Sequence, residues 1–122
     1  MRALVVDDSR AIRVVIGRLL REVGFEVVEA GNGREGLERL KEGRPDVILV
    51  DWNMPEMNGF EFVVAVRAQS AWDDVPLMMV TTETETEQMA RALEAGANEY
   101  VMKPFSRDAL LEKLAVLGVV GG

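Results

Sequence analysis

Short apolar runs alternate with amphipathic stretches along the chain, and each such pair predicts a strand followed by a helix. The predicted strands are residues 3–6, 25–29, 47–50, 77–80 and 99–102. Fully apolar runs of this length, such as 47–50, are typical of strands covered by helices on both faces. The alternation of apolar and polar positions in 25–29 is typical of a strand near a sheet edge.

Helical periodicity follows each predicted strand. The first helix begins after its cap, Ser9, carries its apolar residues on one face and ends at Gly24. The later helices are predicted around 37–43, at 60–66, from 84 or 86 to 96, and from 106 to about 114. Because every connection contains a helix, the strands are expected to be parallel. We therefore predict an α/β fold: a doubly wound, five-stranded, flavodoxin-like (βα)5 sheet in the order 2-1-3-4-5.

Length and hydropathy indicate one compact domain. The 122 residues suit a single core, so we expect one domain over 1–122. The longest apolar runs are strand-length, well short of the roughly 20 residues that cross a bilayer. The N-terminus lacks the pattern of a secretory leader. We therefore expect a cytoplasmic protein.

Two features of the composition exclude broad classes of function. Neither Cys nor His occurs, which excludes disulfides, thiol chemistry and metal sites built on those ligands. A bound metal would need oxygen ligands, which favours Mg²⁺, Ca²⁺ or Mn²⁺. The net charge is −7, with Lys and Arg spread along the chain, so we expect no direct contact with nucleic acid.

Polar residues at the carboxyl ends of four predicted strands carry the candidate chemistry. Asp7 and Asp8 follow the first strand, Asp51 the third, Thr81 the fourth and Lys103 the fifth. The carboxyl ends of parallel strands share one edge, and for this order the ligand crevice lies between the first and third strands. We therefore expect these side chains to converge on one pocket.

Three carboxylates in one pocket would repel one another. Each pair at ~4 Å costs on the order of 4 kcal/mol at an effective dielectric near 20, more than one ammonium offsets. Mg²⁺ would relieve the repulsion and keep room for a phosphoryl oxygen, because it binds few protein ligands and retains waters. Lys103 supplies a positive charge and Thr81 a hydroxyl for that group. The pattern predicts phosphoryl transfer to a carboxylate.

Five separated motifs resemble the receiver domains of two-component response regulators. They are Asp7-Asp8, Asp51 ahead of Met54-Pro55, Asn58-Gly59, Thr81 and Lys103-Pro104-Phe105. The match spans Met1 to about Leu117 and is similar to the CheY-like, stand-alone chemotaxis type. That family has the strand order predicted above, which adds to the resemblance.

The resemblance implies a role for each pocket residue. Asp51 would be the phosphoacceptor. Asp8, Asp51 and the backbone carbonyl of Asn53 would bind Mg²⁺, while Asp7 would act through a metal-bound water. Lys103 would pair with Asp51 and then with the phosphoryl group.

The resemblance also implies a switch. Thr81 would move to bond the phosphoryl group, and Tyr100 would turn inward as it moves. Asn53 and Glu83 would set the rate of self-hydrolysis. The peptide bond between Lys103 and Pro104 would be cis, which only proline makes cheap.

An output surface and partners follow from the same resemblance. The helix after the fourth strand, the fifth strand and the last helix would form this surface, including Met89, Tyr100 and Lys113. The donor would be a sensor histidine kinase or a small acyl phosphate. The target would be a protein, with a flagellar motor switch as the family-based expectation. The chain would be a signalling switch that catalyses only its own phosphorylation and dephosphorylation.

Alternative interpretations remain open. The chain could be a phosphorelay shuttle or a receiver cut from a larger regulator. A flavin carrier would need a loop after the first strand that holds phosphate, where Asp7-Asp8 would repel it. An aspartyl phosphatase would carry Asp-x-Asp there and usually a cap domain. A receiver that works without phosphorylation would lack a pocket residue, and all are present.

Two aromatic residues have structural interpretations. Tyr100 fits a half-buried packing residue as well as a switch, and Trp52 is expected to lie partly exposed.

Overall fold

Five parallel strands form one sheet in the order β2-β1-β3-β4-β5, which confirms the predicted topology. The structure, a computed structural model, describes residues 1–82 and 86–120. The strands are β1 (Arg2–Val6), β2 (Glu26–Ala30), β3 (Val47–Asp51), β4 (Leu77–Thr81) and β5 (Glu99–Met102). The strands β3 and β4 thus include Asp51 and Thr81 as their last residues.

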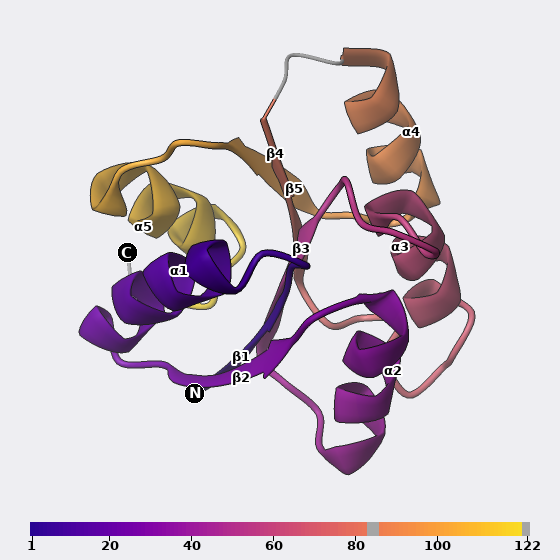
Figure 1. The fold of residues 1–122 in the computed structure, drawn as a ribbon, viewed down its shortest axis with the longest axis horizontal. Helices are drawn as coiled ribbons and strands as arrows, with labels where there is room; N and C mark the ends of the chain where they lie inside the picture. Colours follow the sequence, from indigo (N-terminus) through magenta and orange to yellow (C-terminus); the bar gives the residue numbers. More distant parts are fainter. Residues whose placement is uncertain (83–85, 121–122) are drawn as a thin grey trace.

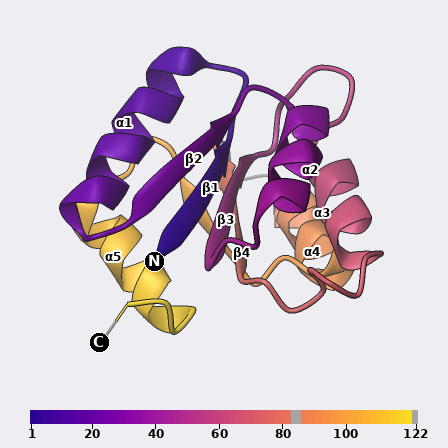
Figure 2. The ribbon, with the colours of Figure 1, turned by 90° about the horizontal axis from the view of Figure 1, so that it is seen from below.

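Helices cover both faces of this sheet. Within the described residues they are α1 (Arg10–Glu22), α2 (Gly33–Glu42), α3 (Gly59–Arg67), α4 (Thr86–Ala95) and α5 (Arg107–Val116). Figure 1 shows α1 and α5 on one side of the sheet and α2, α3 and α4 on the other, and Figure 2 shows the same layers from below. None of the described helices is long and apolar enough to span a membrane.

The alternation of side chains along each strand divides the core in two. On β3, Val47 and Leu49 pack with α1 and α5, whereas Ile48 and Val50 pack with α2, α3 and α4. All five residues of β3 and of β4 are buried, as expected for strands between two helical layers. The core therefore holds the carboxyl ends of β1, β3 and β4 in fixed relative positions.

Side-chain caps start most of the helices. The oxygens of Ser9, Asn32 and Ser106 each accept a hydrogen bond from a backbone N–H of the first turn. Asn58 and Glu61 form a capping box, so α3 begins one residue before the predicted Phe60. Asn32 and Asn58 are thus the caps of α2 and α3.

The second strand is displaced by one residue from its predicted position. Phe25 donates its backbone N–H to the carbonyl of Leu20 at 3.0 Å, which closes the end of α1. Gly24, with a φ of 98°, makes the turn between them. Because this N–H serves the helix, the strand begins at Glu26. It ends at Ala30 rather than at Glu29, and Ala30 pairs with Val6 of β1 and accepts the N–H of Asp7.

Gly59 allows α3 to begin against the end of β3. A Cβ added there would lie 2.6 Å from the backbone oxygen of Asp51 and 2.9 Å from Cα of Trp52. The N–H of Gly59 also donates to the carbonyl of Trp52 at 2.9 Å. The end of the Met79 side chain, also 2.6 Å away, could shift, but the other two obstacles are backbone. A side chain at Gly59 could therefore be accommodated only by moving the segment that carries Asp51.

The substitution Gly59→Ala is expected to lower the free energy of unfolding by about 1–3 kcal/mol, the usual cost of overpacking. Urea unfolding measures it. Gly17→Ala in the middle of α1 is the matched control, because the nearest atom to its Cβ is the flexible guanidinium of Arg21 at 3.3 Å. That change is expected to be neutral or stabilising, since Ala favours a helix by roughly 0.5–1 kcal/mol over Gly. Equal effects of the two substitutions would contradict the close-approach argument.

Candidate functional site

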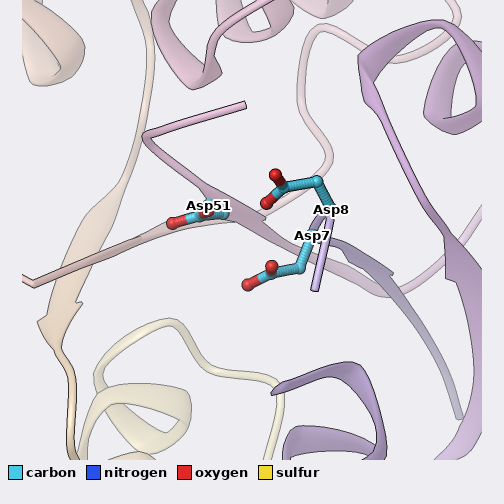
Figure 3. Close-up of side chains that lie close together, drawn as sticks. All are labelled: Asp7, Asp8 and Asp51. Atoms are coloured by element: carbon cyan, nitrogen blue, oxygen red, sulfur yellow. The ribbon is translucent and has the colours of Figure 1, made fainter. Parts of the chain in front are cut away.

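Three carboxylates meet at the carboxyl-terminal edge of the sheet, where β1 and β3 are neighbours. Val6 on β1 pairs with Val50 on β3, so the residues that follow lie side by side. Oxygens from Asp7, Asp8 and Asp51 all lie within 4.8 Å of one another. Figure 3 shows Asp7 and Asp8 on the chain directly after β1, beside Asp51 at the end of β3. The predicted convergence of these three residues is confirmed.

The environments of the three carboxylates differ. Asp7 is 1% exposed and Asp51 6%, whereas Asp8 is exposed to solvent. Asp7 Oδ1 accepts a hydrogen bond from the N–H of Ser9 at 2.9 Å, and the Asp7 N–H donates to the carbonyl of Ala30. Ser9 therefore both caps α1 and orients Asp7. The cluster has a buried, oriented side and an open side formed by Asp8.

Lys103 bridges the two buried carboxylates. Its Nζ lies 3.1 Å from Asp7 Oδ2 and 3.2 Å from Asp51 Oδ1, and its side chain is 15% exposed. The family resemblance implied that this lysine pairs with Asp51 alone, so the bond to Asp7 is an addition. Burial by itself lowers the pKa of Lys103, but hydrogen bonding to Asp7 and the charge of Asp51 outweigh it and raise that pKa.

Two backbone features place Lys103. Its N–H donates to the carbonyl of Thr81 at 2.6 Å, so the ends of β4 and β5 lie together. The peptide bond between Lys103 and Pro104 is cis, as the sequence led us to expect. Thr81 is 3% exposed and pairs in register with Met102. Asp51 pairs with Val80, so Thr81 lies one position beyond the acid on the adjacent strand.

The ion pairs found within residues 1–82 and 86–120 do not balance the charges of the cluster. One ammonium, that of Lys103, pairs with two of its three carboxylates. Burial raises the pKa of Asp51, the negative charge of Asp7 raises it further, and Lys103 offsets only part of this. A further positive charge at this edge would favour the ionised form of Asp51.

The cluster fits a small, hard cation. Ligands on opposite sides of an octahedral Mg²⁺ lie about 4.2 Å apart, twice the usual Mg–O distance. Three oxygens within 4.8 Å of one another are therefore close enough to share one such cation. The donor set of carboxylates without sulfur or imidazole is the one that Mg²⁺ prefers. The acidic pocket is thus consistent with Mg²⁺ binding.

An open hollow lies on the Asp8 side of the cluster. It has a volume of about 460 Å³ and is lined by Asp8, Trp52, Asn53, Met54, Pro55 and Asn58. Asn53 is exposed there, beside the carboxylate cluster. A phosphoryl donor could approach the site from this side without a change in the fold.

Trp52 is buried, which corrects the expectation that it lies partly exposed. Its side chain is 7% exposed and belongs to the core beneath α2, α3 and α4. The indole ring of Trp52 is tilted against the ring of Phe60, with centroids 6.3 Å apart. The guanidinium of Arg91 on α4 lies over the ring of Phe60. The start of α3, which Gly59 allows to lie close to β3, covers the indole. The sequence pattern alone does not predict this contact.

The expected output surface is only partly exposed. Met89 is 5% exposed and packs in the core, so its expected place on this surface is corrected. The helical period turns Met89 and Ala92 inward, while Leu93 of α4 is exposed. Tyr100 is partly buried, with Lys113 Nζ 5.2 Å from its ring centroid. Glu83, expected to tune hydrolysis, lies outside the described residues.

Comparisons with known proteins agree with this architecture. Residues 3–115 match the family model of the response regulator receiver domain. The chain is 44% identical over 119 residues to the chemotaxis protein CheY1 of Helicobacter pylori, covering 96% of each. It is 45% identical over 125 residues to a chemotaxis protein CheY homolog of Campylobacter jejuni, covering 100% of this chain and 96% of the relative. The solved structure of the chemotaxis protein CheY4 of Vibrio cholerae superimposes with a TM-score of 0.91 at 43% identity, covering 95% of this chain and 97% of that one.

Proposed function

This chain belongs to the family of response regulator receiver domains, and we propose that it is a phosphorylation switch in which Asp51 accepts the phosphoryl group. The observation that carries the proposal is the meeting of Asp7, Asp8 and Asp51 at one edge of the sheet, with Lys103 bonded to two of them. Such a site needs a cation and offers a nucleophile and a phosphate-binding ammonium.

Asp51 is better placed than Asp7 to act as the nucleophile. Asp7 is buried, and its two oxygens already bond Ser9 and Lys103. In the transfer, an oxygen of Asp51 forms a bond to phosphorus as the bond from phosphorus to the donor breaks, and the donor keeps the electron pair. Mg²⁺, held by Asp8, Asp51 and the backbone carbonyl of Asn53, would supply charge neutralisation for the phosphoryl oxygens.

Side chains around Asp51 suit a conformational response. A phosphoryl group adds roughly two negative charges at pH 7. Lys103 Nζ, 3.2 Å from Asp51 Oδ1, can follow the new oxygens, and the hydroxyl of Thr81 can move to bond one of them. We propose that Tyr100 then repacks beneath Lys113 and changes the surface formed by α4, β5 and α5. Asn53 and Glu83 are proposed to tune the hydrolysis that resets the switch.

The names of the relatives suggest the pathway. Proteins of 42–45% identity are chemotaxis proteins. We propose that the donor is a sensor histidine kinase and that the target is a protein of chemotaxis, with a flagellar motor switch as the first candidate. A phosphorelay shuttle is the alternative, and it would differ in passing the phosphoryl group on to a histidine of another protein.

Titration with Mg²⁺ tests the site directly. Trp52 directly follows Asp51, so its fluorescence is expected to change saturably as Mg²⁺ binds and again when beryllofluoride, a phosphoryl mimic, is added. The variant Trp72→Phe leaves Trp52 as the single reporter. Asp8→Asn in that background is expected to weaken Mg²⁺ binding at least tenfold through the loss of a charged ligand. If Mg²⁺ changes neither the fluorescence nor the stability of the protein, the proposed switch is wrong.

A further inference from the structure

The peptide group between Asp7 and Asp8 connects the buried side of the cluster to its open side. Asp7 is fixed through its carboxylate and its N–H. Within residues 1–82 and 86–120, the carboxylate of Asp8 makes no hydrogen bond or ion pair. The Cα–Cβ bond from which the Asp8 carboxylate reaches the cluster is therefore placed by the backbone alone, and above all by the peptide group that precedes it.

Arg13 of α1 holds that peptide group. Its Nη1 donates to the backbone carbonyl of Asp7, and its Nε lies 3.1 Å from Glu29 Oε1 on β2. The side chain of Arg13 is only 16% exposed. One guanidinium therefore joins α1, β2 and the loop that carries the first two acids. A planar fork with fixed donor directions suits such a bridge better than a lysine would.

We propose that Arg13 is a positioning residue for the cation site: by holding the carbonyl of Asp7 it directs the carboxylate of Asp8 toward Asp51. This inference rests on the proposed Mg²⁺ site. Residues that hold metal ligands in place commonly affect metal affinity 10–100-fold when replaced.

The sign of the effect separates positioning from simple electrostatics. Arg13 is a cation beside a cation site, so deleting its charge favours Mg²⁺ binding as far as Coulomb forces go. Loss of positioning has the opposite sign. The carboxylate of Glu29, paired with Arg13, already offsets part of the positive charge of Arg13. We therefore expect the loss of positioning to affect Mg²⁺ affinity more than the loss of this charge.

The experiment measures the Mg²⁺ dissociation constant of folded protein by Trp52 fluorescence. For Arg13→Met we expect about tenfold weaker binding. The matched control is Arg10→Met, which removes the same charge from an exposed position in the first turn of α1 and is expected to leave binding unchanged or slightly tighter. Arg13→Met binding as tightly as the wild type, or more tightly, would overturn the proposal.

A second variant covers the case in which Arg13→Met does not fold. Arg13→Lys keeps the charge but removes the fork, so we expect weaker binding than in the wild type. Wild-type affinity in a folded Arg13→Lys protein would show that the bridge is dispensable and would also overturn the proposal. Failure of the wild type itself to bind Mg²⁺ would instead contradict the proposed function, so the two failures are distinguishable.

Discussion

Asp51→Asn is expected to abolish labelling of the protein by acetyl phosphate in the presence of Mg²⁺, while the fold is retained. A neutral carboxamide is a poor nucleophile, and Asp7 cannot replace the lost acid because its oxygens bond Ser9 and Lys103. The intact mass after incubation measures the transfer, with the wild type gaining one phosphoryl group. A variant that is labelled as well as the wild type would show that the acceptor is another residue.

The same substitution is expected to stabilise the protein at pH 7 in the presence of a chelator. Burial and the charge of Asp7 raise the pKa of Asp51 above its ordinary value of 3.8, so folding favours the protonated form. The wild type therefore loses stability as the pH rises from below 3.8 through the raised pKa, whereas the Asn variant carries no such titration. The difference between their thermal midpoints should be small at low pH and should grow as the pH rises.

Asp74→Asn provides a control of opposite sign for this pH dependence. The hydrogen bond and the charge of Arg44 lower the pKa of this exposed acid, so its contribution to stability is present above pH 3.8 and is lost as the pH falls through the lowered pKa. Its removal is expected to be slightly destabilising at pH 7 and neutral in acid. If both variants shift stability in the same direction with pH, the shift does not come from the cluster.

Lys103→Met is expected to lower the free energy of unfolding by about 3–5 kcal/mol at pH 7 with chelator present. The change leaves the carboxylates of Asp7 and Asp51, with side chains 2% and 8% exposed, without the ammonium that bridges them. Urea unfolding measures the loss. Mg²⁺ or acidification should restore much of it, because either reduces the uncompensated negative charge. The raised pKa of Lys103 means that its contribution persists until the pH rises beyond 10.5 and through that pKa.

The control for Lys103→Met is Lys113→Met. Lys113 also forms an ion pair, with Glu99 at 3.1 Å, but its side chain is 32% exposed, so we expect a loss of at most about 1 kcal/mol. Comparable losses for the two variants would contradict the argument from burial.

The Lys103→Met variant should still take the phosphoryl group, but its phosphorylation should no longer change binding to the target. Target binding that still responds to phosphorylation would count against its role in coupling.

Local pattern was sufficient to predict the buried parallel strands and the place of the acids. Runs such as 47–50 and 77–80 are apolar throughout because helices cover both faces of β3 and β4, and the structure has both layers. Once the strands are parallel, Asp7, Asp8 and Asp51 must lie at one edge. Neither step requires knowledge of which side chains touch.

Burial and bonding beyond this pattern were not predictable in the same way. Trp52 and Met89 were expected at the surface and are buried, Trp52 against the start of α3 and Met89 on the inner side of α4. Both outcomes depend on how closely one element approaches another, and a single glycine, Gly59, sets one of those approaches. A hydrophobic period reports that a residue has a buried side, but not which neighbour covers it.

By itself, the sequence determined the parallel sheet and the edge at which the acids gather, because these follow from periodicity and from the geometry of parallel strands. The strand order was predicted from the doubly wound fold pattern and from the family resemblance. Only the tertiary structure decided that Lys103 is shared with Asp7 and that Arg13 holds the carbonyl of Asp7. These contacts join residues from different elements, 96 positions apart for Lys103 and Asp7, and only the packed chain brings such charged groups within bonding distance.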